Sequence, residues 1–321
     1  MRLRASAAQA FWGLVVVAVG AVVGLATLVA WQAPVLAAGV WQACADAAVA
    51  VAGLLPALGL VLPTALLAGG VAAALGVAIL QLYHTRRLER WVRARRVPWP
   101  APLAEALADF EPDQRTLLVD DLAPYTFTLG LRRPHVWVSA GLVEALDPAE
   151  LQAVLRHERH HLWRRDPLRV FVSRCLARLA FFVPMAPALR DAYLVAKEVE
   201  ADAASGADDA LAAALLKLLR SGPRLPVPAH LAAIGPVDAT AARIQRLAAG
   251  QGRLQPTGVR RPRILTSLAV ALALVAVSYF STARTAGPLA DNECGYSAAP
   301  ARAAVWQTPA SWQTASLAGR P

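Results

Sequence analysis

Long stretches without charged side chains restrict what this chain can fold into. No charged residue occurs from Ala5 to Ala45, and the apolar run at 11–31 is long enough to cross a hydrocarbon core of about 30 Å as a helix. The next uncharged stretch has a dense apolar part at 54–82, and a third run, from Ile264 to Ala283, lies between two arginines. We therefore expect an integral membrane protein, mainly α-helical, with about three transmembrane helices.

Basic residues gather at the ends of these apolar runs. The formal net charge of +10 would by itself suit nucleic acid or anionic lipid. The clusters flank the predicted helices, which is the pattern of the positive-inside rule. They comprise Arg2 and Arg4, the arginines from Arg86 to Arg96, and those from Arg260 to Arg263. We expect a multi-pass protein of the cell membrane, with the lipid bilayer as a partner and no direct contact with nucleic acid.

The predicted topology divides the chain into four parts. These are an N-terminal membrane region (1–83), a cytoplasmic domain (84–263), a transmembrane helix (264–283) and a short extracytoplasmic tail (284–321). Two alternatives concern the first part: the N-terminal run could be a signal peptide, although these have shorter apolar cores, or residues 33–53 could add a membrane segment. Cys44 and Cys294 would both face outside, where a disulfide could join them.

The cytoplasmic segment predicts a domain with a small β-sheet. Residues 102–110 have a helical pattern, while 116–120 and 135–139 are short β-rich runs separated by a stretch with Gly and Pro. Asp147 is a good N-cap, because a proline follows it at the first turn and a glutamate stands three residues on. We expect a helix to begin there and to continue past His157.

That helix contains an H-E-x-x-H motif, formed by His157, Glu158 and His161. Residues four apart share a helical face, so the two imidazoles can bind one metal ion with Glu158 beside them. Zn²⁺ in such a site lowers the pKa of a water molecule to about 7, and the carboxylate can accept the proton as the water attacks a peptide carbonyl. His160 lies off this axis and is not an expected ligand. The motif predicts a zinc-dependent peptidase.

A third metal ligand is expected among the acids of residues 196–205. The cysteines of the chain lack the paired spacing of zinc sites, so a carboxylate has to complete a site of the two-histidine, one-carboxylate kind. On a helix Glu198 and Asp202 share one face, so Glu198 can bind the metal while Asp202 accepts a hydrogen bond from a ligating imidazole. Glu200 points away from that face and is the competing ligand.

The chain resembles the BlaR/MecR-type membrane zinc peptidases in the H-E-x-x-H motif, the E-x-x-x-D sequence further along, the segment 124–158 and the run ARIQRL at 242–247. It is more distantly similar to the HtpX and CAAX-protease gluzincins. The resemblance implies a zincin-like domain that binds zinc through His157, His161 and Glu198. It assigns Glu158 as general base and Asp202 as the acid beside the ligands. It also implies a protein or peptide substrate, in this family a cytoplasmic repressor of the BlaI/MecI kind.

By the same resemblance, the β-rich run at 135–139 would be the sheet edge that pairs with an extended substrate. The residues expected to line the substrate are Val136, Trp137, Val138 and Ser139. The group that stabilises the oxyanion is not defined by the motif, and the candidates are Tyr125, His135 and Arg243.

The apolar segment 168–189, which contains several arginines, constrains the topology. A single crossing there would put His157 and Glu198 on opposite sides of the membrane, where they could not share a metal ion. We therefore expect an interfacial helix whose arginines reach toward lipid headgroups, with a buried helix or a returning hairpin as the alternatives.

Two other functions fit the same residues. Quality control of membrane proteins, as by HtpX, would use the site on a broad range of substrates, and a non-catalytic signalling scaffold would use it as a structural metal site. The intact Glu158 argues against the scaffold, because a structural site has no use for a base. The β-lactam sensors of the family carry a penicillin-binding domain after the last span. Residues 284–321 contain no S-x-x-K, so we do not expect direct β-lactam sensing.

Overall fold

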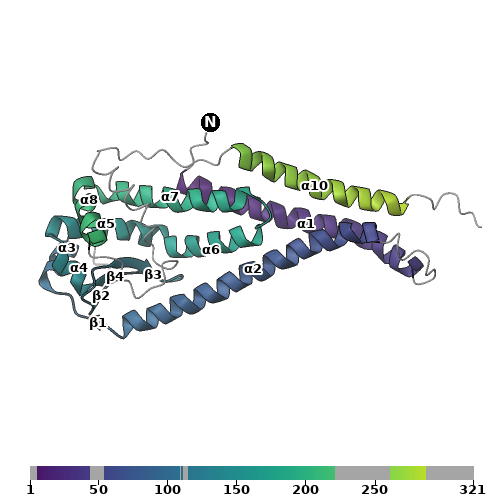
Figure 1. Cartoon of the computed structure of the whole chain (residues 1–321). Coiled ribbons are helices and arrows are strands. Elements are labelled where there is room, and N and C mark those ends of the chain that lie inside the picture. The colour runs from purple at the N-terminus through teal and green to yellow at the C-terminus, as the bar shows by residue number, and fades with distance from the viewer. Residues whose placement is uncertain (1–5, 44–53, 109, 111–114, 221–260, 287–321) are drawn as a thin grey trace, which may run out of the picture.

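The computed structural model describes residues 6–43, 54–108, 110, 115–220 and 261–286, and it has an elongated shape (Figure 1). Long helices lie side by side, and a small sheet with shorter helices lies at one end. Among the described residues, three helices are long and apolar enough to cross a membrane. They are α1 (Ala7–Ala43), α2 (Leu54–Arg93) and α10 (Arg261–Ala286). The expectation of three membrane helices and a small sheet is confirmed.

Two of these helices extend beyond the predicted apolar runs. Helix α1 continues to Ala43, so residues 33–43 belong to the first helix and form no separate segment. Helix α2 continues without a break to Arg93, and it thereby connects the membrane region directly to the sheet. Cys44, Cys294 and most of the predicted tail lie outside the described residues.

The sheet contains four strands in the order β1-β2-β4-β3. The strands are β1 (Arg96–Val97), β2 (Thr116–Val119), β3 (Thr126–Leu129) and β4 (His135–Ser139). Strand β4 pairs in parallel with β2 on one side and antiparallel with β3 on the other. The prediction that Val136, Trp137, Val138 and Ser139 form a substrate-pairing edge is therefore wrong, because neighbouring strands lie along both sides of β4. Strand β3 lies at that edge of the described sheet.

Side chains alternate between the two faces of the sheet, as the pleat requires. Val136 and Val138 join the core that includes Leu118 and the apolar side chains of helix α5. Trp137 lies in a second core with Leu88 of α2. The sheet thus separates helix α5, on one face, from the end of the membrane helix α2, on the other.

Helix α5 (Pro148–Arg164) begins where the sequence predicts. The Asp147 side chain accepts a hydrogen bond from the Glu150 backbone N–H at 2.9 Å, and the Glu150 side chain accepts one from the Asp147 N–H, also at 2.9 Å. This capping box satisfies two backbone donors that the helix itself cannot. The neighbouring helices of the domain are α3 (Ala101–Ala108), α4 (Ala140–Ala145) and α8 (Asp208–Arg220).

Residues 168–189 form a returning hairpin, so the favoured prediction of a single interfacial helix is wrong. Helix α6 (Asp166–Leu179) runs out along α2, the chain turns, and α7 (Met185–Ser205) returns along α1 (Figure 1). The tip of the hairpin packs against the membrane helices because both surfaces are apolar: Ala180 joins a cluster with Leu14 and Ala18 of α1. The return brings α7, which carries Glu198, back beside α5.

A glycine in α2 permits close contact with the hairpin tip. A Cβ atom added at Gly70 would overlap the carbonyl oxygen of Leu179, so only glycine fits this approach of helix to backbone. On α7, the Met185 backbone N–H donates to Ser267 Oγ of α10 at 3.0 Å. Three membrane helices therefore contact the hairpin that carries Glu198.

Candidate metal centre

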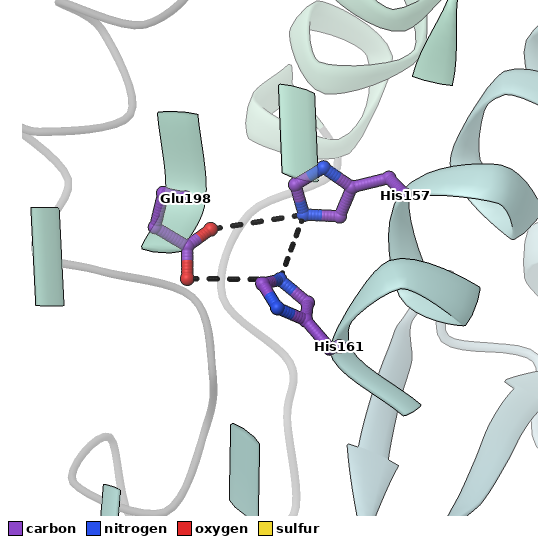
Figure 2. Close-up of side chains that lie close together, drawn as sticks. All are labelled: His157, His161 and Glu198. Carbon is purple, nitrogen blue, oxygen red and sulfur yellow. Dashed lines mark hydrogen bonds and ion pairs between the residues drawn. The ribbon is translucent and has the colours of Figure 1, made fainter. Parts of the chain in front are cut away.

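Three side chains from two helices converge at the end of the hairpin nearest the sheet (Figure 2). His157 and His161 come from α5, and their Nε2 atoms lie 3.1 Å apart. Glu198 comes from α7, with its carboxylate oxygens 3.7 Å from His157 Nε2 and 3.8 Å from His161 Nε2. One ligand atom from each residue lies within 4.8 Å of the others, which is the spacing that a shared metal ion requires.

Each imidazole has a further carboxylate on its far side. His157 Nδ1 lies 3.1 Å from Asp202 Oδ1, and His161 Nδ1 lies 2.6 Å from Asp166 Oδ2. A proton on Nδ1 held by a carboxylate leaves Nε2 as the metal-binding atom and fixes the plane of the ring. Asp202 is the acid that the sequence suggests for this position.

Sequence reasoning did not identify Asp166. It follows Arg165, which ends α5 in the left-handed conformation with φ of 52°. This turn starts α6 and brings Asp166 back to His161, while Tyr193 on α7 donates to its other oxygen at 3.3 Å. The signal that could have revealed it is an Asp-Pro pair at a helix start just after the motif.

Glu158 is held beside the two histidines by a neighbour on the sheet edge. Thr128 Oγ1 on β3 lies 2.8 Å from Glu158 Oε2 and 3.1 Å from the Glu158 backbone oxygen. Glu158 is buried, as are both histidines. Because the Thr128 hydroxyl donates a hydrogen bond to the carboxylate, it fixes the orientation of the group that would act as base.

For the peptidase that the H-E-x-x-H motif predicts, replacing Thr128 with valine is expected to lower peptide hydrolysis by about 10–100-fold, the range for a lost hydrogen bond to a charged group. Zinc content should stay unchanged, and Thr128→Ser should restore activity. Thr126→Val is the matched control, because Thr126 lies two residues away on the same strand and its hydroxyl has no partner among the described residues. Equal losses for Thr126→Val and Thr128→Val in kcat measurements would contradict a positioning role for Thr128.

The competing ligand Glu200 is engaged elsewhere. Its carboxylate accepts a hydrogen bond from the Ala7 backbone N–H at 2.9 Å and pairs with Arg164 at 3.0 Å. His160 is half-buried outside the converging group, and burial lowers its pKa below the usual value. Lys197 is a buried neighbour that the sequence analysis did not consider, and its Nζ contacts Glu198.

Two of the three oxyanion candidates lie on the wrong face of the sheet. Tyr125 packs in the core beside α2, and its hydroxyl donates to Asp121 at 3.1 Å. Burial and the Asp121 charge raise the pKa of Tyr125 above its usual value. His135 lies beside Trp137 on that same face. Arg243 lies outside the described residues.

The converging residues fit zinc by their chemistry. Two imidazole nitrogens and one carboxylate are a common ligand set of zinc hydrolases. Both imidazoles have the outer carboxylate partner that ligating histidines usually have. Both histidines are buried and Glu198 is partly buried.

Comparison with known families identifies this arrangement. Residues 4–220 match the family model described as BlaR1 peptidase M56. The chain belongs to this family. The M56 match covers the first two membrane helices, the sheet, and both helices that carry the converging residues. A family of membrane peptidases therefore accounts for this part of the fold. The resemblance inferred from the motifs is confirmed.

Several relatives of this M56 chain are named as HtpX proteases. A protease HtpX homolog from Moorella thermoacetica is 37% identical over 125 residues, which are 35% of this chain and 40% of that protein. Protease HtpX homolog 2 from Methanosarcina mazei is 35% identical over 80 residues, 24% of this chain and 27% of the relative. A protease HtpX homolog from Acidiphilium cryptum is 38% identical over 68 residues, which are 21% of this chain and 24% of that protein. The matched regions thus span less than half of each relative.

Proposed function

We propose that this membrane protein is a zinc-dependent endopeptidase with zinc held by His157, His161 and Glu198 and with Glu158 as general base. The observation that carries the proposal is the convergence of these ligands beside a carboxylate that Thr128 already orients. A structural metal site would not need a buried carboxylate held in this way, and this argues against the scaffold function.

In the proposed mechanism, the side chains around the site have different roles. Zinc, when bound, supplies a Lewis acid that polarises the peptide carbonyl and acidifies water. Glu158 accepts the proton of the attacking water and passes it to the leaving amine. Asp166 and Asp202 keep the imidazole rings in place through their Nδ1 atoms, so the ligands do not have to reorganise during the reaction.

The substrate is proposed to bind in extended form along β3. This strand lies at the edge of the described sheet, next to α5, and its Thr128 contacts the base Glu158. A peptide paired with β3 by β-augmentation would pass directly beside the base. Strand β3 therefore takes the role that the sequence analysis assigned to β4.

We place the catalytic domain in the cytoplasm. The arginines that follow the apolar part of α2 and those at the start of α10 lie at the domain side of both helices, in agreement with the positive-inside rule. The Ala7 N–H contact with Glu200 puts the start of α1 close to the metal site. The site would therefore lie at the cytoplasmic surface of the membrane, within reach of soluble proteins.

Regulatory cleavage of a repressor of the BlaI/MecI kind is the proposed biological role, by analogy with the M56 family. The HtpX relatives favour a second candidate, quality control of membrane proteins. The two differ in breadth of substrate, since a regulatory protease should cut a repressor at one site and a quality-control protease should cut many unfolded proteins.

The test uses the full chain in neutral detergent with casein and with a purified BlaI/MecI-like repressor. We expect cleavage that 1,10-phenanthroline stops and that added zinc restores, since the chelator removes the metal from its ligands. A single repressor fragment with casein intact would support the regulatory role, and broad digestion of casein with the repressor intact would support quality control. Cleavage that persists after chelation and metal removal would contradict the zinc mechanism.

A further inference from the structure

A hollow lies on the face of the sheet that points away from helix α5 and the metal centre. Its volume is about 750 Å³, within the range of small-molecule sites. The lining residues are Arg93, Arg96, Trp99, Thr116, Leu117, Arg133, His135 and Trp137. We call this hollow the arginine pocket. It contains none of the residues that the proposed peptidase mechanism uses, so an inference about it does not rest on that mechanism.

Three arginines line the arginine pocket. Arg93 is the last residue of α2, Arg96 belongs to β1, and Arg133 precedes β4. As far as the structure describes the chain, no acidic side chain lines the pocket, and the ion pairs of lysine and arginine involve other residues. A pocket lined by three arginines and by no acidic side chain favours an anionic ligand, above all one that accepts forked hydrogen bonds.

An exposed indole ring adds a second kind of contact. Trp99 is 42% exposed at the pocket, although it is a large apolar side chain. Trp137 also lines the pocket but is only 1% exposed. The exposed face of an indole binds flat rings well.

We propose that the arginine pocket binds an organic phosphate that carries a flat ring, the chemistry of a nucleotide. The arginine side chains would hold the phosphate, and Trp99 would stack on the ring. A lipid phosphate is the other source of this chemistry. Arg93 lies ten residues beyond Tyr83 on α2, or about 15 Å along the helix. Since Tyr83 is an exposed aromatic residue at the end of the apolar run, the pocket lies beyond the headgroup level.

The experiment titrates the full chain in neutral detergent with adenosine monophosphate, adenosine and inorganic phosphate by isothermal calorimetry. We expect adenosine monophosphate to bind at least tenfold more tightly than adenosine or inorganic phosphate. Arg96→Ala and Trp99→Ala should each weaken its binding at least tenfold. Both side chains are exposed, so circular dichroism and thermal unfolding should match the wild type. Arg220→Ala, which removes one exposed positive charge at the end of α8, is the matched control and should bind normally.

Several results would overturn this proposal. One is the absence of binding by adenosine monophosphate in the millimolar range, and another is an equal loss for Arg96→Ala and Arg220→Ala, which would indicate a general charge effect. If inorganic phosphate bound as tightly as adenosine monophosphate, the ring would make no contribution to binding. Binding of phosphatidylglycerol vesicles that depends on Arg96, with no binding of the nucleotide, would assign the pocket to lipid.

Discussion

Replacing Glu158 with glutamine is expected to lower peptide hydrolysis by about 10²–10⁴-fold, the contribution of a positioned general base. Glutamine has nearly the same shape and can still contact Thr128, but it cannot accept the proton of the attacking water. Zinc content should stay at the wild-type level, because the ligands His157, His161 and Glu198 are unchanged. The measurement is kcat on a fluorogenic peptide, together with zinc per chain by inductively coupled plasma mass spectrometry.

Glu144→Gln is the matched control for that variant. Glu144 is an exposed acid on α4, so its replacement removes the same charge from the same domain without touching the base. It should leave both kcat and zinc content as in the wild type. If Glu158→Gln lost its zinc, Glu158 would be a ligand, and if it kept wild-type kcat, another group would be the base.

Replacing Glu198 with glutamine is expected to remove zinc and activity together. The neutral amide is a much weaker ligand than the carboxylate that lies 3.7 Å and 3.8 Å from the two imidazole nitrogens. Losing a residue that only contacts a metal ligand typically lowers metal affinity by about 10–100-fold. Because Glu198 is itself a proposed ligand, its loss should lower the affinity by more than about 100-fold. Competition with a zinc chelator of known affinity measures this loss, and hydrolysis of the fluorogenic peptide should fall in parallel.

The variant Glu200→Gln tests whether zinc loss in Glu198→Gln comes from the loss of a ligand or from the removal of any negative charge on α7. Glu200 lies two residues further along the same helix and contacts Ala7 and Arg164. Its replacement should weaken the contact between α1 and α7 and leave zinc affinity unchanged. Loss of zinc in Glu200→Gln with retention in Glu198→Gln would reverse the assignment of the third ligand.

The features that could be predicted from the sequence are those set by neighbours in the chain. Asp147 and Glu150 define the start of α5 through a local capping box, and helical periodicity alone puts His157 and His161 on one face. The pairing of Asp202 with His157 follows from the same periodicity, once α7 is known to lie beside α5. Local rules therefore predicted most of the converging side chains.

The sheet was predicted less well because strand order is not local. Strand β3 has only four residues, and the nearby Pro124 and Gly130 suggested a loop. The family resemblance implies that the strand at 135–139 is the edge, and the sequence predicts no strand at 126–129 that would cover it. Thr128 was missed for the same reason, since its contact with Glu158 spans 30 residues of sequence.

The hairpin of α6 and α7 was also misjudged. Arginines such as Arg174 and Arg178 within an apolar segment suggested a helix lying on the membrane surface. The turn at 180–184 and the packing of Ala180 against Leu14 produce two antiparallel helices instead. Contacts between distant segments decided this outcome, and they are not visible in the local pattern.

The most direct test of the account is zinc K-edge X-ray absorption on the purified full chain, with zinc content and casein cleavage measured on the same sample. We predict about one zinc per chain, in a shell of nitrogen and oxygen at about 2.0–2.2 Å without sulfur, and cleavage that depends on this zinc. A wild-type protein that cleaves casein without zinc, or whose zinc is bound by sulfur, would contradict a metal centre built from His157, His161 and Glu198.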